Sequence, residues 1–98
     1  MQAIKKVEII IEYMEVPRLL EVLKKEVVDV GYTVIKEAFG AGRRGEMAGD
    51  GFSGEFTNSY LLIECSEDEA NRIVEIVRPI LKRFGGVCLV SDAMWVKH

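Results

Sequence analysis

The chain has 98 residues, 49% of them hydrophobic, and a net charge of −3, which is the composition of one small globular domain spanning residues 1–98. The acidic balance argues against a nucleic-acid-binding protein, and no apolar run approaches the roughly 18 residues of a membrane-spanning helix. The chain enters a strand pattern directly, without a signal-peptide-like segment, and we expect Cys65 and Cys88 to be reduced. Together these features predict a cytoplasmic protein.

The first two predicted elements are a strand and a helix. Apolar and acidic side chains alternate over residues 4–14, which indicates a strand. A helix follows from Val16, with Pro17 in its first turn, where a missing N–H is tolerated. Apolar residues continue at helical spacing as far as Val30, so Gly31 is expected to cap the C-terminus of this helix.

The second helix has clear signals at both ends. Ser66 and Glu69 have the spacing of a capping box, which predicts that the helix begins just after Ser66. Gly85-Gly86 is expected to end it. The remaining strands are predicted over residues 32–39, 57–65 and 87–96.

The predicted order βαββαβ is that of the ferredoxin-like split βαβ fold, of the α+β class. Right-handed crossovers would place both helices on one face of a four-stranded antiparallel sheet. The opposite face is apolar too, since Tyr60 and Leu62 alternate with Leu61 and Ile63 in the third strand. Strands that are apolar on both faces need cover on both. We therefore predict a homo-oligomer that packs through the open sheet face.

A glycine-rich loop, residues 40–56, joins the second and third strands and holds six of the nine glycines. A structureless loop of this length is uncommon in a compact domain unless it has a function. Arg43 and Arg44 near its base carry fixed positive charge, and Gly40 and Gly42 would let the backbone approach an anion. The pattern favours a phosphate-binding loop, with a plain flexible hairpin connection as the alternative.

The rest of the sequence offers no convincing catalytic or metal-binding cluster. Its carboxylates are dispersed, and Cys65 and Cys88 lack a third ligand for a metal. We therefore expect neither an enzyme nor a metalloprotein. The Gly85-Gly86 turn is a second place where a ligand could reach the backbone, and it could meet the glycine-rich loop across a subunit interface.

Three segments resemble the strand entry, T-loop and B-loop of the trimeric PII-like signalling proteins: Gly31-Tyr32-Thr33-Val34, the Gly40–Arg44 loop base and the Gly85-Gly86 turn. The resemblance is strongest to the divergent PII-like proteins associated with bicarbonate transporters and carboxysome gene clusters. Those relatives bind adenine nucleotides (ATP, ADP, AMP or cyclic AMP) in clefts between subunits. The resemblance implies a non-enzymatic regulator whose loop controls a partner, such as an inorganic-carbon or other membrane transporter.

The resemblance also implies a set of nucleotide-binding residues. Arg43 and Arg44 would hold phosphate, while Gly40 and Gly42 admit the loop backbone. The other implied positions are Gly31 and Thr33 beside the adenine, Glu64 and Cys65 at the end of the third strand, and Gly86 and Val87 as the second wall of the cleft.

The sequence departs from the nitrogen-sensing PII proteins at the loop base, where Ala41-Gly42 replaces their Arg-Gln. The glutamine that helps to hold magnesium and 2-oxoglutarate is therefore missing. Three alternatives share the fold: a CutA-like metal-binding module, an ACT-like small-molecule-binding module and an acylphosphatase-type hydrolase. The lack of a metal cluster weighs against the CutA-like module, and the long central loop weighs against the ACT-like module. The acylphosphatase type would need an Arg-containing turn after the first strand, which this sequence lacks.

Overall fold

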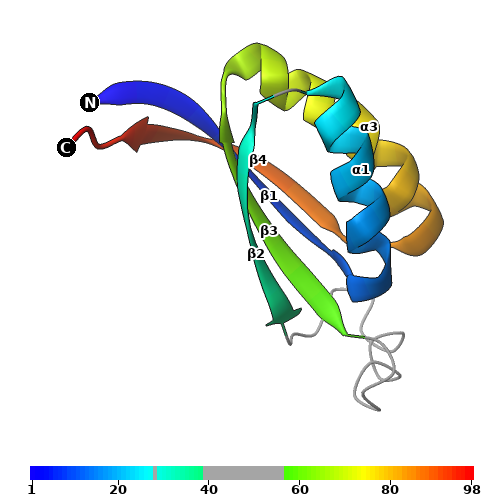
Figure 1. Cartoon of the computed structure of the whole chain (residues 1–98). Coiled ribbons are helices and arrows are strands. Elements are labelled where there is room, and N and C mark those ends of the chain that lie inside the picture. Colours follow the sequence, from blue (N-terminus) through cyan, green and yellow to red (C-terminus); the bar gives the residue numbers. More distant parts are fainter. Residues whose placement is uncertain (28, 39–56) are drawn as a thin grey trace.

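The computed structural model describes residues 1–27, 29–38 and 57–98. Within these ranges the chain forms a four-stranded sheet with both helices on one face (Figure 1). The elements are β1 (Gln2–Glu12), the short 3₁₀ helix η1 (Tyr13–Glu15), α1 (Val16–Glu26), β2 (Gly31–Ala38), β3 (Asn58–Cys65), α3 (Glu67–Phe84) and β4 (Val87–Trp95). The strand order is β2-β3-β1-β4, and neighbouring strands are antiparallel. The predicted ferredoxin-like fold is confirmed.

The hydrophobic core lies between the sheet and the two helices. Every second residue of the central strands β1 and β3 points towards the helices, and the helices contribute one apolar stripe each. The side chains with no solvent exposure include Val7, Ile9, Ile11, Leu19, Leu61, Ile63, Ile73 and Val77. Burial of each of these side chains contributes about 1.5–3 kcal/mol to the stability of the fold. This single layer is therefore the main source of that stability.

Helix α3 has both ends predicted from the sequence. Ser66 Oγ accepts a hydrogen bond from the Glu69 N–H at 3.2 Å, and the Ser66 N–H donates to Glu69 Oε1 at 2.8 Å. Gly85 ends the helix with φ 83°. Gly86 follows with φ 126°, and a Cβ at this position would lie 2.5 Å from the carbonyl oxygen of Ile10. Glycine is therefore required where the chain turns into β4.

The C-terminus of α1 differs from the prediction. The helix ends at Glu26, and Val27 already has a non-helical backbone with φ −129° and ψ 86°. The left-handed residue is Asp29, with φ 68°, whereas Gly31 begins β2. The apolar spacing predicted a longer helix because Val27 and Val30 are also apolar. Both residues pack against the core, but they lie in the segment that connects α1 to β2.

The first strand also ends earlier than predicted. β1 stops at Glu12, because the Tyr13 N–H donates to the Thr57 carbonyl at 2.7 Å and the chain turns into η1. β2 pairs irregularly with β3 between Ile35 and Ala38. β1 begins at Gln2, two residues before the predicted start, and the boundaries of the other three strands agree with the prediction to within one residue.

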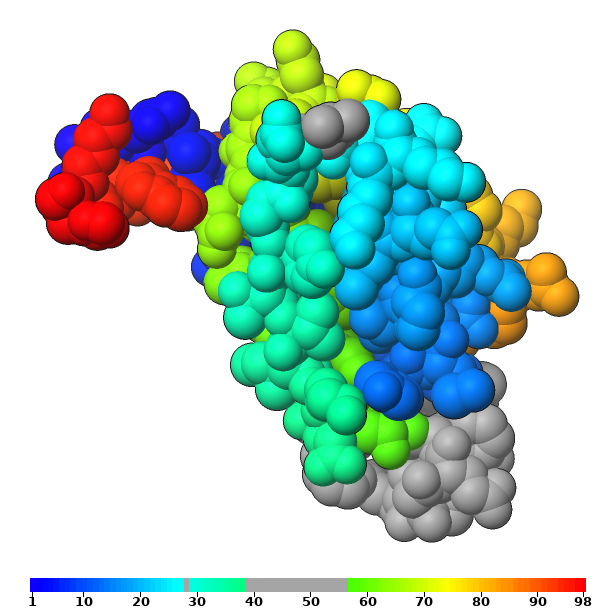
Figure 2. All heavy atoms as spheres, viewed as in Figure 1, coloured from blue at the N-terminus to red at the C-terminus, as the bar shows by residue number. Residues whose placement is uncertain are grey.

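The sheet extends past the helices as a two-stranded arm, formed by Gln2–Ile4 of β1 and Ala93–Trp95 of β4. The last pair between β3 and β1 is Cys65–Lys5. The arm residues of β1, which precede Lys5, therefore pair with β4 alone. Figures 1 and 2 show this arm projecting away from the helical layer. The molecule is elongated as a result, with dimensions of 42 × 26 × 20 Å. Within the described residues, no helix has the length and apolar character needed to cross a membrane.

Candidate functional site

Most of the described candidate residues lie on the open face of the sheet, opposite the helices. Residues paired across neighbouring strands share a face, so the register defines three rows on this face. They are Gly31–Glu64–Lys6–Ser91, Thr33–Leu62–Glu8–Leu89 and Ile35–Tyr60–Ile10–Val87, running from β2 to β4. Large apolar side chains are uncovered here, with Leu89 56% and Ile35 53% exposed. The open face therefore exposes apolar side chains, as predicted, but it also carries polar ones, among them Lys6, Glu8 and Glu64.

Gly31, Thr33 and Glu64 form one group at the β2 edge of this face. Gly31 pairs directly with Glu64, and Thr33 follows two residues along on the same face. Gly31 and Thr33 are exposed, and a Cβ at Gly31 would meet no atom within 4 Å. The fold of a single chain therefore does not require glycine at position 31, and the space above it is open to a ligand.

Cys65 does not join this group, although it is adjacent to Glu64 in the sequence. Its side chain is 6% exposed and packs in the core, on the helical side of the sheet. Burial, assisted by the negative charges of Glu69 and Glu64, raises the pKa of the Cys65 thiol. Successive residues of a strand point to opposite faces, so the Cys65 side chain is a neutral core group and does not reach the open face.

Gly86 and Val87 lie at the other edge of the sheet and towards its other end. Val87 pairs with Ile10 at the start of β4, whereas the Gly31 row reaches β4 at Ser91. β2 and β4 are separated by β3 and β1, which amounts to about 14 Å across the sheet. Within one chain, the two predicted walls of the cleft therefore do not form one pocket.

The four predicted loop residues, Gly40, Gly42, Arg43 and Arg44, lie outside the described residues. The strand residues nearest the loop are Ala38 and Asn58, which pair with each other at the end of the sheet where β4 begins. Ser59 Oγ donates a hydrogen bond to the Lys36 carbonyl at 2.7 Å, which links the C-terminal end of β2 to β3. The described residues on either side of the loop thus lie on the β2–β3 side, at the Val87 end of the sheet.

A polar cluster in the middle of the open face was missed by sequence reasoning. Tyr60 Oη donates to Glu8 Oε2 at 2.7 Å, and Lys6 Nζ lies 3.8 Å from Glu8 Oε1. The hydrogen bond to Glu8, with some burial, raises the pKa of the Tyr60 phenol. Lys6 and Glu8 lie two residues apart on one face of β1, but only the register between β1 and β3 brings Tyr60 next to Glu8.

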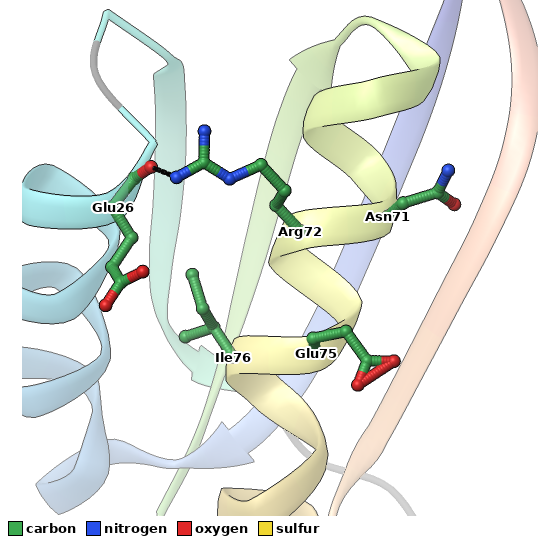
Figure 3. Close-up of a pocket in the computed structure, with 5 residues that line it drawn as sticks. All are labelled: Glu26, Asn71, Arg72, Glu75 and Ile76. Carbon is green, nitrogen blue, oxygen red and sulfur yellow. Dashed lines mark hydrogen bonds between the residues drawn. The ribbon is translucent and has the colours of Figure 1, made fainter.

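Two hollows are present elsewhere on the described surface. A groove of about 460 Å³ lies between α1 and α3, where Arg72 donates to the Glu26 carbonyl at the end of α1 (Figure 3). A smaller hollow of about 80 Å³ lies between α1 and β2 and is lined in part by Asp29 and Tyr32. Neither is lined by a predicted site residue. In the described part of the chain, no three His, Cys, Asp or Glu side chains are grouped to hold a metal.

The fold and the site thus define a ferredoxin-like domain whose candidate ligand-binding groups are divided between two edges of one sheet. The family model described as Nitrogen regulatory protein P-II matches residues 4–98. The chain therefore belongs to the P-II family, which confirms the resemblance found in the sequence. No curated protein matches it.

Solved structures share this fold. CPII, a nitrogen regulatory PII-like protein from Thiomonas intermedia K12, solved bound to ADP, AMP and bicarbonate, is 23% identical with a TM-score of 0.76; the match covers 95% of this chain and 88% of CPII. CPII bound to ADP, AMP and acetate gives 22% identity and a TM-score of 0.76, covering 98% and 91%. A putative PII-like signaling protein from Thermus thermophilus is 25% identical with a TM-score of 0.74, covering 97% and 90%.

Proposed function

We propose that this protein is a PII-like regulator that binds an adenine nucleotide between the subunits of a homotrimer. The observation that carries the proposal is the position of Gly31, Thr33 and Glu64 at one sheet edge and of Gly86 and Val87 at the other. One chain cannot place both groups around one ligand, so the site has to be completed by a second copy. Membership of the P-II family and the ADP and AMP bound to CPII support an adenine nucleotide as the ligand.

The separation of the two groups also favours a cyclic assembly. In a closed ring, the β2 edge of each copy meets the β4 edge of the next, and every interface contains one complete site. A two-fold dimer joined through like edges would leave the two groups apart. The number three comes from the family resemblance. Packing through the open face would cover Leu89 and Ile35, which are 56% and 53% exposed in the single chain.

In this site the adenine lies near Thr33 of one copy and Gly86-Val87 of its neighbour. The phosphates contact Arg43, Arg44 and the backbone around Gly40 and Gly42, since guanidinium groups form charge-assisted, bidentate hydrogen bonds with phosphate. Nucleotide occupancy then favours one arrangement of the loop, and the loop acts on a partner protein. The bicarbonate in CPII makes an inorganic-carbon transporter a reasonable partner to test.

Calorimetric titration of the intact oligomer with ATP, ADP, AMP and cyclic AMP tests the ligand. Arg43→Ala should weaken ADP binding by about tenfold to a hundredfold, corresponding to about 1.5–3 kcal/mol for a lost charged hydrogen bond, and leave adenosine binding unchanged. Arg78→Ala is the matched control, because Arg78 is exposed on α3 and pairs with Glu75 at 3.5 Å. Equal losses for nucleoside and nucleotide would assign Arg43 to folding or assembly, and no binding of any nucleotide would refute the proposal.

A further inference from the structure

The start of β2 carries two of the candidate ligand-binding residues and is held on one side only. Gly31 is the first residue of β2, and Thr33 follows two positions later. β2 is an edge strand, so within one chain its backbone pairs with β3 alone, with Gly31 opposite Glu64 and Thr33 opposite Leu62. On the helical side, the hollow of about 80 Å³ lies between this strand and α1. The position of Gly31 and Thr33 therefore depends on how the chain is held just before β2.

The segment before β2 leads out of α1 through a residue with a left-handed backbone. α1 ends at Glu26, and Asp29 has φ 68°. Aspartate tolerates this region better than most residues, but the conformation still has a cost and persists only where the surrounding structure holds it. Val27 and Val30 give part of that support by packing against the core. The end of α1 has to be fixed as well, because a shift of Glu26 would be passed along this short segment to Gly31.

Arg72 of α3 holds that end of α1. Its Nη2 donates a hydrogen bond to the Glu26 carbonyl oxygen, across the groove between the two helices (Figure 3). The last carbonyl groups of a helix have no partner within the helix, and they lie at the negative end of its dipole. A guanidinium group is therefore a favourable partner for the Glu26 carbonyl. Because α3 buries Ile73 and Val77 completely, the contact links the end of α1 to a helix that is anchored in the core.

We propose that Arg72 is a positioning residue of the nucleotide site, which fixes the end of α1 and so keeps Gly31 and Thr33 where the adenine meets them. This inference deepens the proposed function and rests on it. Arg72 belongs to α3, on the helical side of the sheet, and does not touch the ligand. Because binding groups have to be held within about 0.5 Å of their productive positions, a small displacement of β2 is enough to weaken binding.

Calorimetric titration of the intact protein with ADP and with adenosine tests this role. Arg72→Ala should weaken the binding of both ligands by the same factor, about twofold to tenfold, which is the range that the net contribution of one hydrogen bond allows. The equal factor distinguishes Arg72 from Arg43, whose loss should affect ADP alone. Arg72→Lys can still donate to the carbonyl and should restore most of the affinity. Arg78→Ala is the matched control, because it removes a positive charge from the exposed surface of the same helix.

Hydrogen exchange of the ligand-free protein measures the positioning without a ligand. In Arg72→Ala the amides of residues 31–33 should exchange several-fold faster, whereas those of Val7 and Ile9 in β1 should keep their rates. A general loss of stability would accelerate both sets. If both sets accelerate together, or if Arg72→Ala binds ADP and adenosine as tightly as Arg78→Ala, the positioning role is overturned and the proposed function stands. A wild-type protein that binds neither ligand overturns the proposed function, and this role with it.

Discussion

The two faces of the sheet differ in how they are completed. On the helical face, the side chains of Ile9, Ile63 and Val77 have no solvent exposure, because α1 and α3 cover them. On the open face, Ile35 and Leu89 have the same apolar chemistry but are more than half exposed. One chain therefore builds a complete core on one side and an incomplete one on the other. The difference indicates that folding depends on the first face, whereas the assembly proposed above would depend on the second.

Truncating one isoleucine on each face should separate these roles with the largest effect. Ile63→Ala should lower the free energy of unfolding by about 2–5 kcal/mol, because it leaves a cavity in a layer with no exposure. Ile35→Ala should change the stability of the single chain much less and instead weaken the oligomer. Urea titration and light scattering at matched protein concentrations measure the two quantities. Comparable losses of chain stability in both variants would contradict the division between the faces.

Two glycines at candidate site positions should behave differently for the same reason. Gly86→Ala should destabilise the chain by about 1–3 kcal/mol, since φ is 126° and the added Cβ would meet the Ile10 carbonyl oxygen at 2.5 Å. Gly31→Ala should leave stability nearly unchanged, because nothing lies within 4 Å. A loss of nucleotide affinity in Gly31→Ala with unaltered thermal stability would place the ligand at the β2 edge. A strong destabilisation by Gly31→Ala would instead show that this glycine serves the fold.

The smallest expected effect is a pH dependence on the open face. The hydrogen bond to Glu8 raises the pKa of Tyr60 above its ordinary value of 10.0. The neutral phenol is the donor, so its contribution is fully present below pH 10 and is lost as the pH rises through the higher, folded-state pKa. The stability difference between wild type and Tyr60→Phe should therefore shrink in this alkaline range. Tyr32→Phe, on the helical face, is the control, and an equal pH dependence of both variants would refute the assignment.

Features decided by neighbouring residues could be predicted from the sequence. The capping box of Ser66 and Glu69 is one, because its two hydrogen bonds depend only on residues three apart. The end of α1 could not be predicted, because the apolar spacing continues past Glu26 while the tertiary structure places the left-handed turn at Asp29. Apolar spacing and tertiary packing compete at such a boundary, and tertiary packing decides.

The candidate site was predictable only in part. The alternation that places Leu61 and Ile63 in the core also places Cys65 there, so its side chain could have been excluded from the open face. The division of the site between two edges follows from the strand order, in which Thr33 and Val87 belong to the outer strands. No local pattern encodes that order, because it depends on pairing between distant segments.

The pairing of β1 with β4 also has a consequence for biosynthesis. Nine residue pairs join the first strand to the last, from Gln2–Trp95 to Ile10–Val87. Contacts so distant in sequence form slowly, and they cannot form until β4 has been synthesised. Until then, one edge of β1 presents unpaired backbone groups beside apolar side chains, which is a site for pairing with another chain. The emergence of β4 therefore determines when this edge of β1 is covered in the newly made protein.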